Sequence, residues 1–94
     1  MVVAHFFTRR IRGRTYLMCE TACSAPSTSP WTKPETMFEV AEGEGPVDWL
    51  PRIKDRLLAA HPGHNLGDVT VRPDDGAVKR FDVALKHKVK RRFL

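Results

Sequence analysis

The sequence lacks most of the features that mark large enzymes, membrane proteins and disulfide-bonded secreted domains. It has 94 residues, two cysteines and no long apolar run. At this length a chain buries roughly 60–65% of its unfolded surface, which is enough for one thin core. A deep cleft for a large cofactor and a substrate would use most of that core. We therefore expect one domain spanning residues 1–94, and most multi-substrate enzymes are excluded.

Segments that would direct the chain into or across a membrane are also missing. No apolar run approaches the ~20 residues that a membrane-spanning helix needs. The run Met1–Phe7 is too short for a signal peptide, and its basic residues follow it instead of preceding it. Cys19 and Cys23 are too few for a disulfide scaffold. We therefore expect a cytoplasmic protein with reduced thiols and no membrane association.

Charge is unevenly distributed along the chain, although the net charge is only +5. Residues 1–16 contain four arginines and no acid, and residues 35–48 contain five acids and no base. Residues 67–94 contain eight bases and four acids. Such segregation steers partners of complementary charge. An ordinary solvated surface is the alternative explanation.

Hydrophobic periodicity predicts an α+β fold, an antiparallel sheet of about five strands with one amphipathic helix packed on one face. The predicted order is strand, strand, strand, helix, strand, strand. Strands are expected at residues 2–10, 15–21, 37–42, 68–72 and 77–90. In the fourth strand, Val69 and Val71 are predicted to point inward. In the last strand, the apolar face is predicted to consist of Phe81, Val83, Leu85 and Val89.

The helix is predicted to begin with Asp48 as its N-cap, which puts Pro51 at the third helical position, where its missing amide costs little. Its end is predicted at residues 61–63. The apolar stripe of this helix is expected to contain Leu50, Ile53, Leu57 and Ala60, with Leu58 beside it.

Three connections have recognisable turn or loop signals. Residues 11–14 predict a tight hairpin turn that uses Gly13, and residues 73–76 predict a second turn. Residues 24–36 contain three prolines and predict a long Ser/Thr/Pro loop. Trp31 within this loop fits either a binding role or a lid over the core.

Candidate catalytic and metal-binding groups are sparse. A zinc site built from Cys19, Cys23, His61 and His64 is disfavoured, because about forty residues separate the two pairs. No spacing places a histidine beside a cysteine thiol, as a cysteine nucleophile would require. The acids around residues 39–48 do not match a calcium loop. We expect no cofactor and no enzymatic activity.

Basic residues give the more specific signal. Lys86, Lys88 and Lys90 share one strand face at intervals of about 6.6–7 Å, similar to the phosphate spacing along a nucleic-acid strand. Lysines also protect exposed sheet edges from aggregation, which is the alternative explanation. The hairpin tip at residues 12–14 and the basic C-terminal tail at residues 86–94 add charge at both ends of the chain.

The leading hypothesis is a non-enzymatic module that binds nucleic acid or a nucleoprotein complex through phosphate contacts. These contacts would give affinity and little readout of sequence. A homodimer is a geometric option if the first or last strand is exposed at a sheet edge. The residues predicted to contact phosphate are Arg9, Arg10, Arg12, Arg14, Lys86, Lys88, Lys90, Arg91 and Arg92.

Two other hypotheses remain. One is a protein-directed inhibitor or adaptor, of the class of phage anti-CRISPR proteins, that blocks a host complex; its acidic contacts would be Glu39, Glu42 and Glu44. The other is a small enzyme that uses Cys19 or Cys23 with a histidine. Cations scattered over the whole surface, together with a thiol, an imidazole and a carboxylate in one pocket, would contradict the leading hypothesis.

Overall fold

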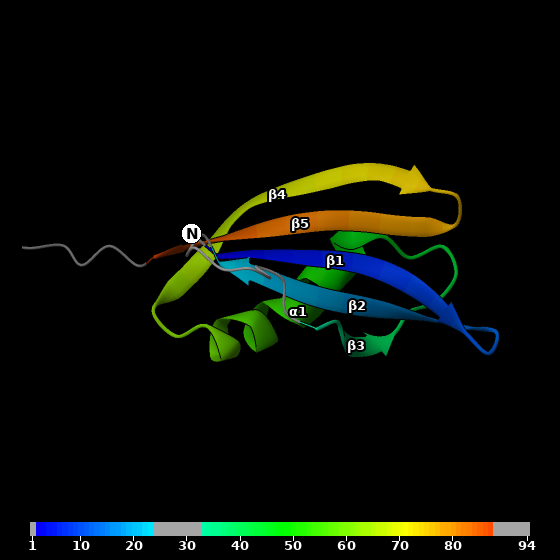
Figure 1. Cartoon of the computed structure of the whole chain (residues 1–94), viewed down its shortest axis with the longest axis horizontal. Helices are drawn as coiled ribbons and strands as arrows, with labels where there is room; N and C mark the ends of the chain where they lie inside the picture. Colours follow the sequence, from blue (N-terminus) through cyan, green and yellow to red (C-terminus); the bar gives the residue numbers. More distant parts are fainter. Residues whose placement is uncertain (1, 24–32, 88–94) are drawn as a thin grey trace, which may run out of the picture.

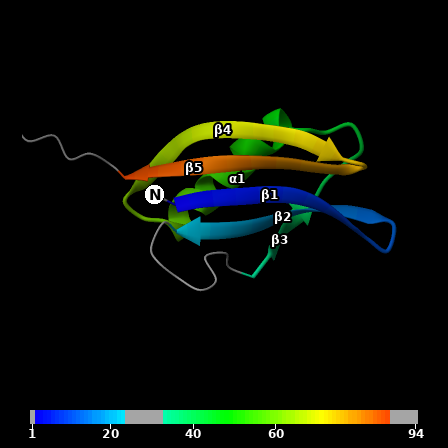
Figure 2. The ribbon, with the colours of Figure 1, turned by 45° about the horizontal axis from the view of Figure 1, so that its top comes forward.

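A computed structural model describes residues 2–23 and 33–87. It contains the strands β1 (Val2–Ile11), β2 (Arg14–Cys23), β3 (Glu35–Glu39), β4 (His64–Asp75) and β5 (Val78–His87), and the helix α1 (Pro46–Ala60). The five strands form one antiparallel sheet in the order β3-β2-β1-β5-β4. The helix crosses one face of this sheet, and the described residues leave the other face open (Figures 1 and 2). The predicted α+β architecture and element order are confirmed.

The first hairpin follows its sequence signal closely. Ile11 pairs with Arg14, so Arg12 and Gly13 form a two-residue turn. Their φ angles are 51° and 79°. Positive φ at both positions is what the right-handed twist of a tight hairpin demands, and glycine adopts it without steric cost. The predicted turn at residues 11–14 is confirmed, and it projects Arg12 beyond the end of the sheet.

The helix begins earlier than predicted. Gly45 is its N-cap, Pro46 is its first residue and Pro51 lies inside it, so the prediction of Asp48 as N-cap is wrong. Asp48 instead accepts a hydrogen bond from the Gly45 backbone N–H at 2.9 Å. The earlier start buries Trp49 to 1% exposure. Burial of this large ring favours the helix although Pro51 cannot donate a helical hydrogen bond, and it leaves the indole Nε1 without an acceptor among the described residues.

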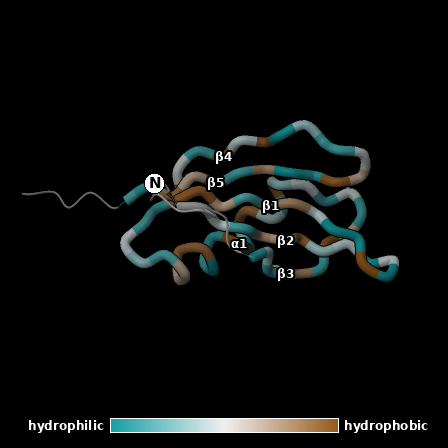
Figure 3. Tube along the Cα trace, viewed as in Figure 1, coloured by the Kyte–Doolittle hydropathy of each residue, from teal (hydrophilic) through white to brown (hydrophobic). Residues whose placement is uncertain are grey.

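The core lies between α1 and the covered face of the sheet. Hydropathy changes repeatedly along β1 and β5, consistent with strands that have one buried side (Figure 3). The Phe6 and Phe81 rings stack 4.9 Å apart at its centre. From the predicted helix stripe, Ile53 and Leu57 are buried, whereas Ala60 is exposed. The core cluster consists of Ala4, Phe6, Leu17, Cys19, Val40, Trp49, Ile53, Leu57, Phe81 and Val83.

Strand boundaries differ from prediction at both edges of the sheet. β3 spans residues 35–39 instead of 37–42, and β4 spans residues 64–75 instead of 68–72. The second hairpin turns at Gly76 and Ala77, because Asp75 still pairs with Val78. The remainder of the predicted loop at residues 24–32, including Trp31, and the predicted strand end at residues 88–90 lie outside the described residues.

Val69 and Val71 are on the helix side of β4 but are not buried. They pair with Val83 and Phe81, whose side chains point into the core. Their predicted inward direction therefore agrees with the structure, but exposures of 39% and 64% keep them out of the core. β4 is an edge strand, and the helix does not cover this part of it. The homodimer option that required an exposed first or last strand does not apply, since β1 and β5 are interior strands.

Candidate functional site

The open face of the sheet carries a row of side chains that spans three strands. Arg72 of β4 lies opposite Arg80 of β5, and Arg80 lies opposite Phe7 of β1. The Arg9 guanidinium lies over the Phe7 ring, 5.6 Å from its centroid. Like charges on directly paired strand positions are unfavourable. The stability of the sheet alone therefore does not explain why Arg72 and Arg80 are paired.

Asp82 holds two members of this face in position. Its carboxylate accepts hydrogen bonds from His5 Nδ1 at 2.6 Å and from Arg72 Nε at 2.7 Å. The carboxylate has no hydrogen to donate, so Nδ1 of His5 carries the proton in this contact. Burial raises the pKa of Asp82, but the hydrogen bonds from His5 and Arg72 outweigh it and lower the pKa below 3.8. Asp82 is therefore ionised at neutral pH.

Arg80 has a donor that no described residue satisfies. Its Nε is buried and finds no hydrogen-bond acceptor among residues 2–23 and 33–87. The side chain lines a shallow hollow of about 350 Å³ together with His5, Glu20, Arg72 and Asp82. A buried donor without an acceptor is energetically costly.

The structure separates the arginines that the sequence grouped together. Arg9 and Arg14 lie on the open face, and Arg12 lies in the turn. Arg10 is two positions after the buried Thr8 on the same strand, so its side chain points to the helix side. Arg14 is 3.8 Å from the Glu39 carboxylate, with both side chains more than half exposed.

Lys86 lies at the opposite end of the open face from the hairpin turn. It follows Leu85, which pairs with Val2 at the start of β1. The length of β1 puts the two basic ends about 30 Å apart. Because β5 is an interior strand, the alternative role of Lys86 as protection of a sheet edge does not apply. The other predicted tail contacts, Lys88, Lys90, Arg91 and Arg92, lie outside the described residues.

Cations also occur on the helix side, where three of them have structural contacts. The Arg52 guanidinium lies 3.8 Å from the Phe38 ring centroid. Arg56 donates to the Met37 carbonyl at 2.8 Å, and Lys79 donates to the Glu44 carbonyl at 2.9 Å. Basic side chains are thus distributed over both faces, and the three named here tie α1 to β3 and β5 to the segment before α1.

The predicted acidic contacts are mostly used within the molecule. Glu39 forms the ion pair with Arg14, and the Glu44 carboxylate accepts from the Ala41 backbone N–H at 2.6 Å. Glu42 is exposed. Substitution of Glu44 would therefore disturb the loop before α1.

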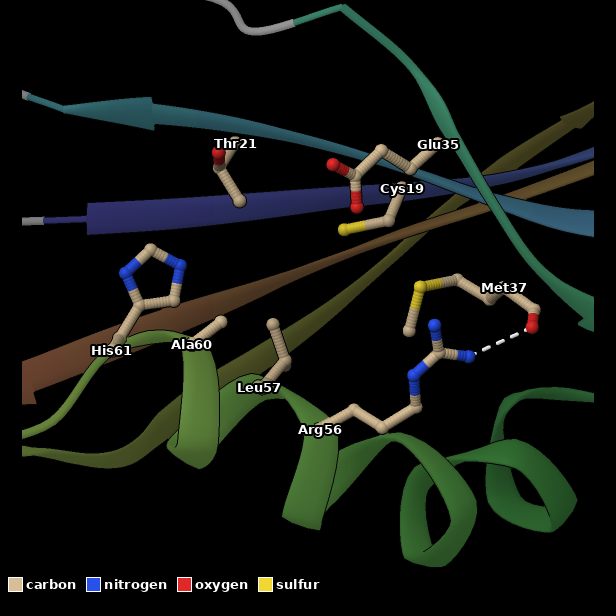
Figure 4. A pocket seen from close by; sticks show the side chains of 8 residues that line it. All are labelled: Cys19, Thr21, Glu35, Met37, Arg56, Leu57, Ala60 and His61. Atoms are coloured by element: carbon tan, nitrogen blue, oxygen red, sulfur yellow. Dashed lines mark hydrogen bonds between the residues drawn. The ribbon is translucent and has the colours of Figure 1, made fainter.

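One hollow does bring a thiol, a carboxylate and an imidazole to the same part of the molecule. It has a volume of about 330 Å³ and lies between the end of α1 and strands β2 and β3. Figure 4 shows the Cys19 thiol beside Glu35, with the His61 ring apart from both at the helix end. The Cys19 thiol donates to the Glu20 carbonyl at 3.9 Å.

The chemistry of this hollow does not favour a nucleophile. Burial, together with the charges of Glu35 and Glu20, raises the pKa of Cys19 to about 12. A cysteine nucleophile needs the opposite shift, because the thiolate is the reactive form. Arg56 lowers the pKa, but by less than the other groups raise it.

Within the described part of the chain, no group of three or more histidine, cysteine or acidic residues is arranged to hold a metal ion. The side chain of Cys23, one of the four residues in the zinc alternative, lies outside that description. No helix among the described residues is long and apolar enough to span a bilayer.

Comparisons with protein-family models, curated proteins and solved structures return no match. Function is therefore argued from the residues of this chain alone.

Sequence reasoning missed Arg72, Arg80 and Phe7 as members of one site. Strand alternation placed Arg80 on a polar face, and that signal was correct. However, β1 and β5 are separated by most of the chain, and nothing local in the sequence indicates that they pair. The contact between His5 and Asp82, 77 positions apart, depends on the same pairing.

Proposed function

We propose that this protein binds single-stranded nucleic acid on the open face of its sheet and does so without catalysing a reaction. The observation that carries the proposal is the row of Arg72, Arg80 and Phe7, with the Arg9 guanidinium over the Phe7 ring. Guanidinium groups recognise phosphate, and aromatic rings stack on unpaired bases.

The shape of the site favours a single strand over a duplex. Side chains on one face of a strand repeat every 6.6–7 Å or so, which suits an extended chain of nucleotides. His5, Phe7 and Arg9 follow each other at this interval along β1. A broad sheet face does not enter a duplex groove, whereas it can present a ring to splayed bases.

Most of the excess positive charge belongs to residues 88–92, outside the described residues. The described residues contain 12 bases and 11 acids, so they are close to neutral. Lys88, Lys90, Arg91 and Arg92 supply the other four bases. They follow Lys86, which is on the open face. In this proposal the body positions the nucleic acid and the basic tail contributes most of the attraction.

The protein-directed inhibitor has less support as a second proposal. Two of its three predicted acidic contacts, Glu39 and Glu44, have partners within the molecule. On the described open face, the carboxylates of Asp82 and Glu39 are paired with neighbouring bases.

Salt dependence tests the electrostatic part of the proposal. We expect a short fluorescent oligothymidine or oligouridine to bind with an affinity that falls steeply between about 50 and about 200 mM salt. Changing the four bases at 88–92 to alanine should reduce the slope of log K against log salt by as much as about 3, at roughly 0.7 per phosphate contact. The proposal would be overturned if neither oligomer bound at low salt, or if the affinity did not depend on salt.

Substitutions on the open face test the site itself. We expect Phe7→Ala to weaken single-strand binding by roughly 5- to 100-fold, the effect of losing one stacked base. Arg80→Ala should weaken it as well, while Lys54→Ala, a charge change on the exposed side of α1, should have little effect. A loss of affinity for Lys54→Ala equal to that for Arg80→Ala would mean that only net charge matters and would contradict the site.

A further inference from the structure

The outer edge of β4 has a sequence that is complementary to itself. Along residues 68–72 the chain reads Asp, Val, Thr, Val, Arg. In an antiparallel pair related by a two-fold axis, one residue lies opposite its own copy. With Thr70 at the axis, Asp68 lies opposite the second copy's Arg72, and Val69 opposite its Val71. We propose that β4 pairs with β4 of a second copy of this chain in this register, which joins two five-stranded sheets into one.

The local structure of β4 leaves this segment open and limits its length. β4 pairs with β5 on one side, and no strand among the described residues pairs with its other side. Towards its start, Gly67 and Asp68 form a bulge, because Leu66 pairs with Leu85 and Val69 already pairs with Val83. At its other end Pro73 lacks a backbone donor. The self-complementary segment thus runs from the second bulge residue, Asp68, to the residue before Pro73, and only its residues 69–72 are in regular register with β5.

The exposed side chains of this segment match what a paired strand needs. Val69 and Val71 are 39% and 64% exposed on the helix side, although they flank core residues of β5. β-branched pairs across two strands are favourable, and exposed edges with such residues tend to associate. The other edge strand, β3, has only 5 residues and exposes Glu35, Thr36 and Glu39.

Charge fixes the register. The Arg72 side chain is 54% exposed, and its Nε contact to Asp82 leaves the two terminal nitrogens of the guanidinium to reach a carboxylate. Centring the pair on Val69 or Val71 instead would put Asp68 or Arg72 opposite Thr70 and lose both ion pairs. Only the Thr70-centred register joins both acids to both arginines.

The symmetry has a consequence for the open face. Directly opposed residues of an antiparallel pair lie on the same side of the sheet. Both helices would therefore cover one side of the joined sheet, and the two Arg72–Arg80 rows would lie next to each other on the other side. The dimer does not depend on nucleic-acid binding, and it is tested without nucleic acid.

Sedimentation of the full chain tests the dimer. We expect a concentration-dependent shift from monomer to dimer in the micromolar range. Asp68→Lys, which sets a lysine against the second copy's Arg72, should weaken dimerisation at least tenfold. Asp74→Lys is the matched control, since it makes the same charge change on β4 outside the paired segment, and it should still dimerise. A wild-type chain that stays monomeric at every concentration overturns the proposal, and so does a dimer that Asp68→Lys leaves unchanged.

A cysteine at the axis tests the register without relying on charge. In this register the two copies of Thr70→Cys lie opposite each other, within the Cα separation that a disulfide spans. We expect mild oxidation to link this variant into a covalent dimer, with far less linkage for Asp74→Cys and for the wild-type chain. Equal linkage in all three proteins, or none for Thr70→Cys, would show that β4 does not pair about Thr70.

Discussion

The two faces of the sheet are built from the same strands but serve different purposes. On the covered face, β1 and β5 present Phe6 and Phe81, which are completely buried and stacked 4.9 Å apart. On the open face, the same two strands present Phe7 and Arg80, which lie opposite each other and are partly exposed. The first pair stabilises the fold, whereas the second leaves a ring and a guanidinium accessible.

This difference shows how a small domain can hold accessible side chains apart from the core that stabilises it. A chain of this size has only one thin core and cannot hold a deep site within it. It can use the second face of the sheet, where strand alternation allows polar and aromatic side chains without any change to the core. The clearest way to test this separation is to change matched residues on the two faces.

The largest effect on stability is expected on the covered face. Phe81→Ala should lower the free energy of unfolding by about 3–5 kcal/mol, because it leaves a cavity beneath α1. That is a large part of the roughly 5–15 kcal/mol that stabilises a typical domain. Urea denaturation measures this change.

Phe7→Ala is the control for this substitution, since it removes the same ring from the open face. We expect it to cost less than about half as much stability while it weakens nucleic-acid binding. An equal loss of stability for both variants would contradict the separation of the two faces.

The second effect concerns Asp82, which supports the open face. Asp82→Asn should cost about 1–2 kcal/mol at neutral pH, because charge-assisted hydrogen bonds to His5 and Arg72 become neutral ones. Since folding lowers the pKa of Asp82, its contribution is complete above the unfolded value of about 3.9 and is lost as the pH falls through the folded value. Denaturation between about pH 2 and 7 should show a smaller acid-induced loss for the variant than for the wild-type protein. Parallel curves would mean that Asp82 does not make these contacts.

The third effect comes from the covered face at high pH. Folding raises the pKa of Cys19 from 9.0 to about 12, so the unfolded chain loses this proton first. Stability is therefore nearly unaffected below about pH 8 and decreases above it, by roughly 1–2 kcal/mol at pH 10. Cys19→Ala should lack this decrease. Lysine and tyrosine titrate in both proteins, so their contribution cancels when the free energies of unfolding of the two proteins are subtracted. A Cys19 that reacts with iodoacetamide at pH 8 in the native Cys23→Ser variant would contradict its burial.

Local signals in the sequence were sufficient for most of the fold. The alternation in residues 81–85, the turn at Gly13 and the positions of the prolines are all patterns among neighbouring residues. These patterns predicted the order of strands along the sequence and the first turn. The predicted start of α1 was wrong because Pro46 and Pro51 each favour the first turn of a helix, and the two positions imply different starts. The burial of Trp49 decided between them, and that burial depends on the sheet beneath the helix.

The candidate site was only partly predictable for a related reason. Charge counts identified Arg9 and Lys86, but they also grouped Arg10 and Arg12 with them, although strand parity and the turn direct these side chains elsewhere. Arg72 and Arg80 became candidates only when the sheet order placed β5 between β1 and β4. Long-range strand pairing is not encoded in local patterns, so a site built across it could not be read from them.

The smallest effect is expected for the exposed ion pair at the hairpin end. Arg14 and Glu39 are 3.8 Å apart, and their side chains are 68% and 51% exposed. Exposed pairs contribute little, so Arg14→Ala should change the free energy of unfolding by less than about 0.5 kcal/mol. The same substitution removes a cation from the open face, and nucleic-acid affinity should fall with a slightly shallower salt dependence. A double-mutant cycle with Glu39→Ala separates the two roles. A coupling energy above about 1 kcal/mol in unfolding would make Arg14 a structural residue and would take it out of the proposed interface.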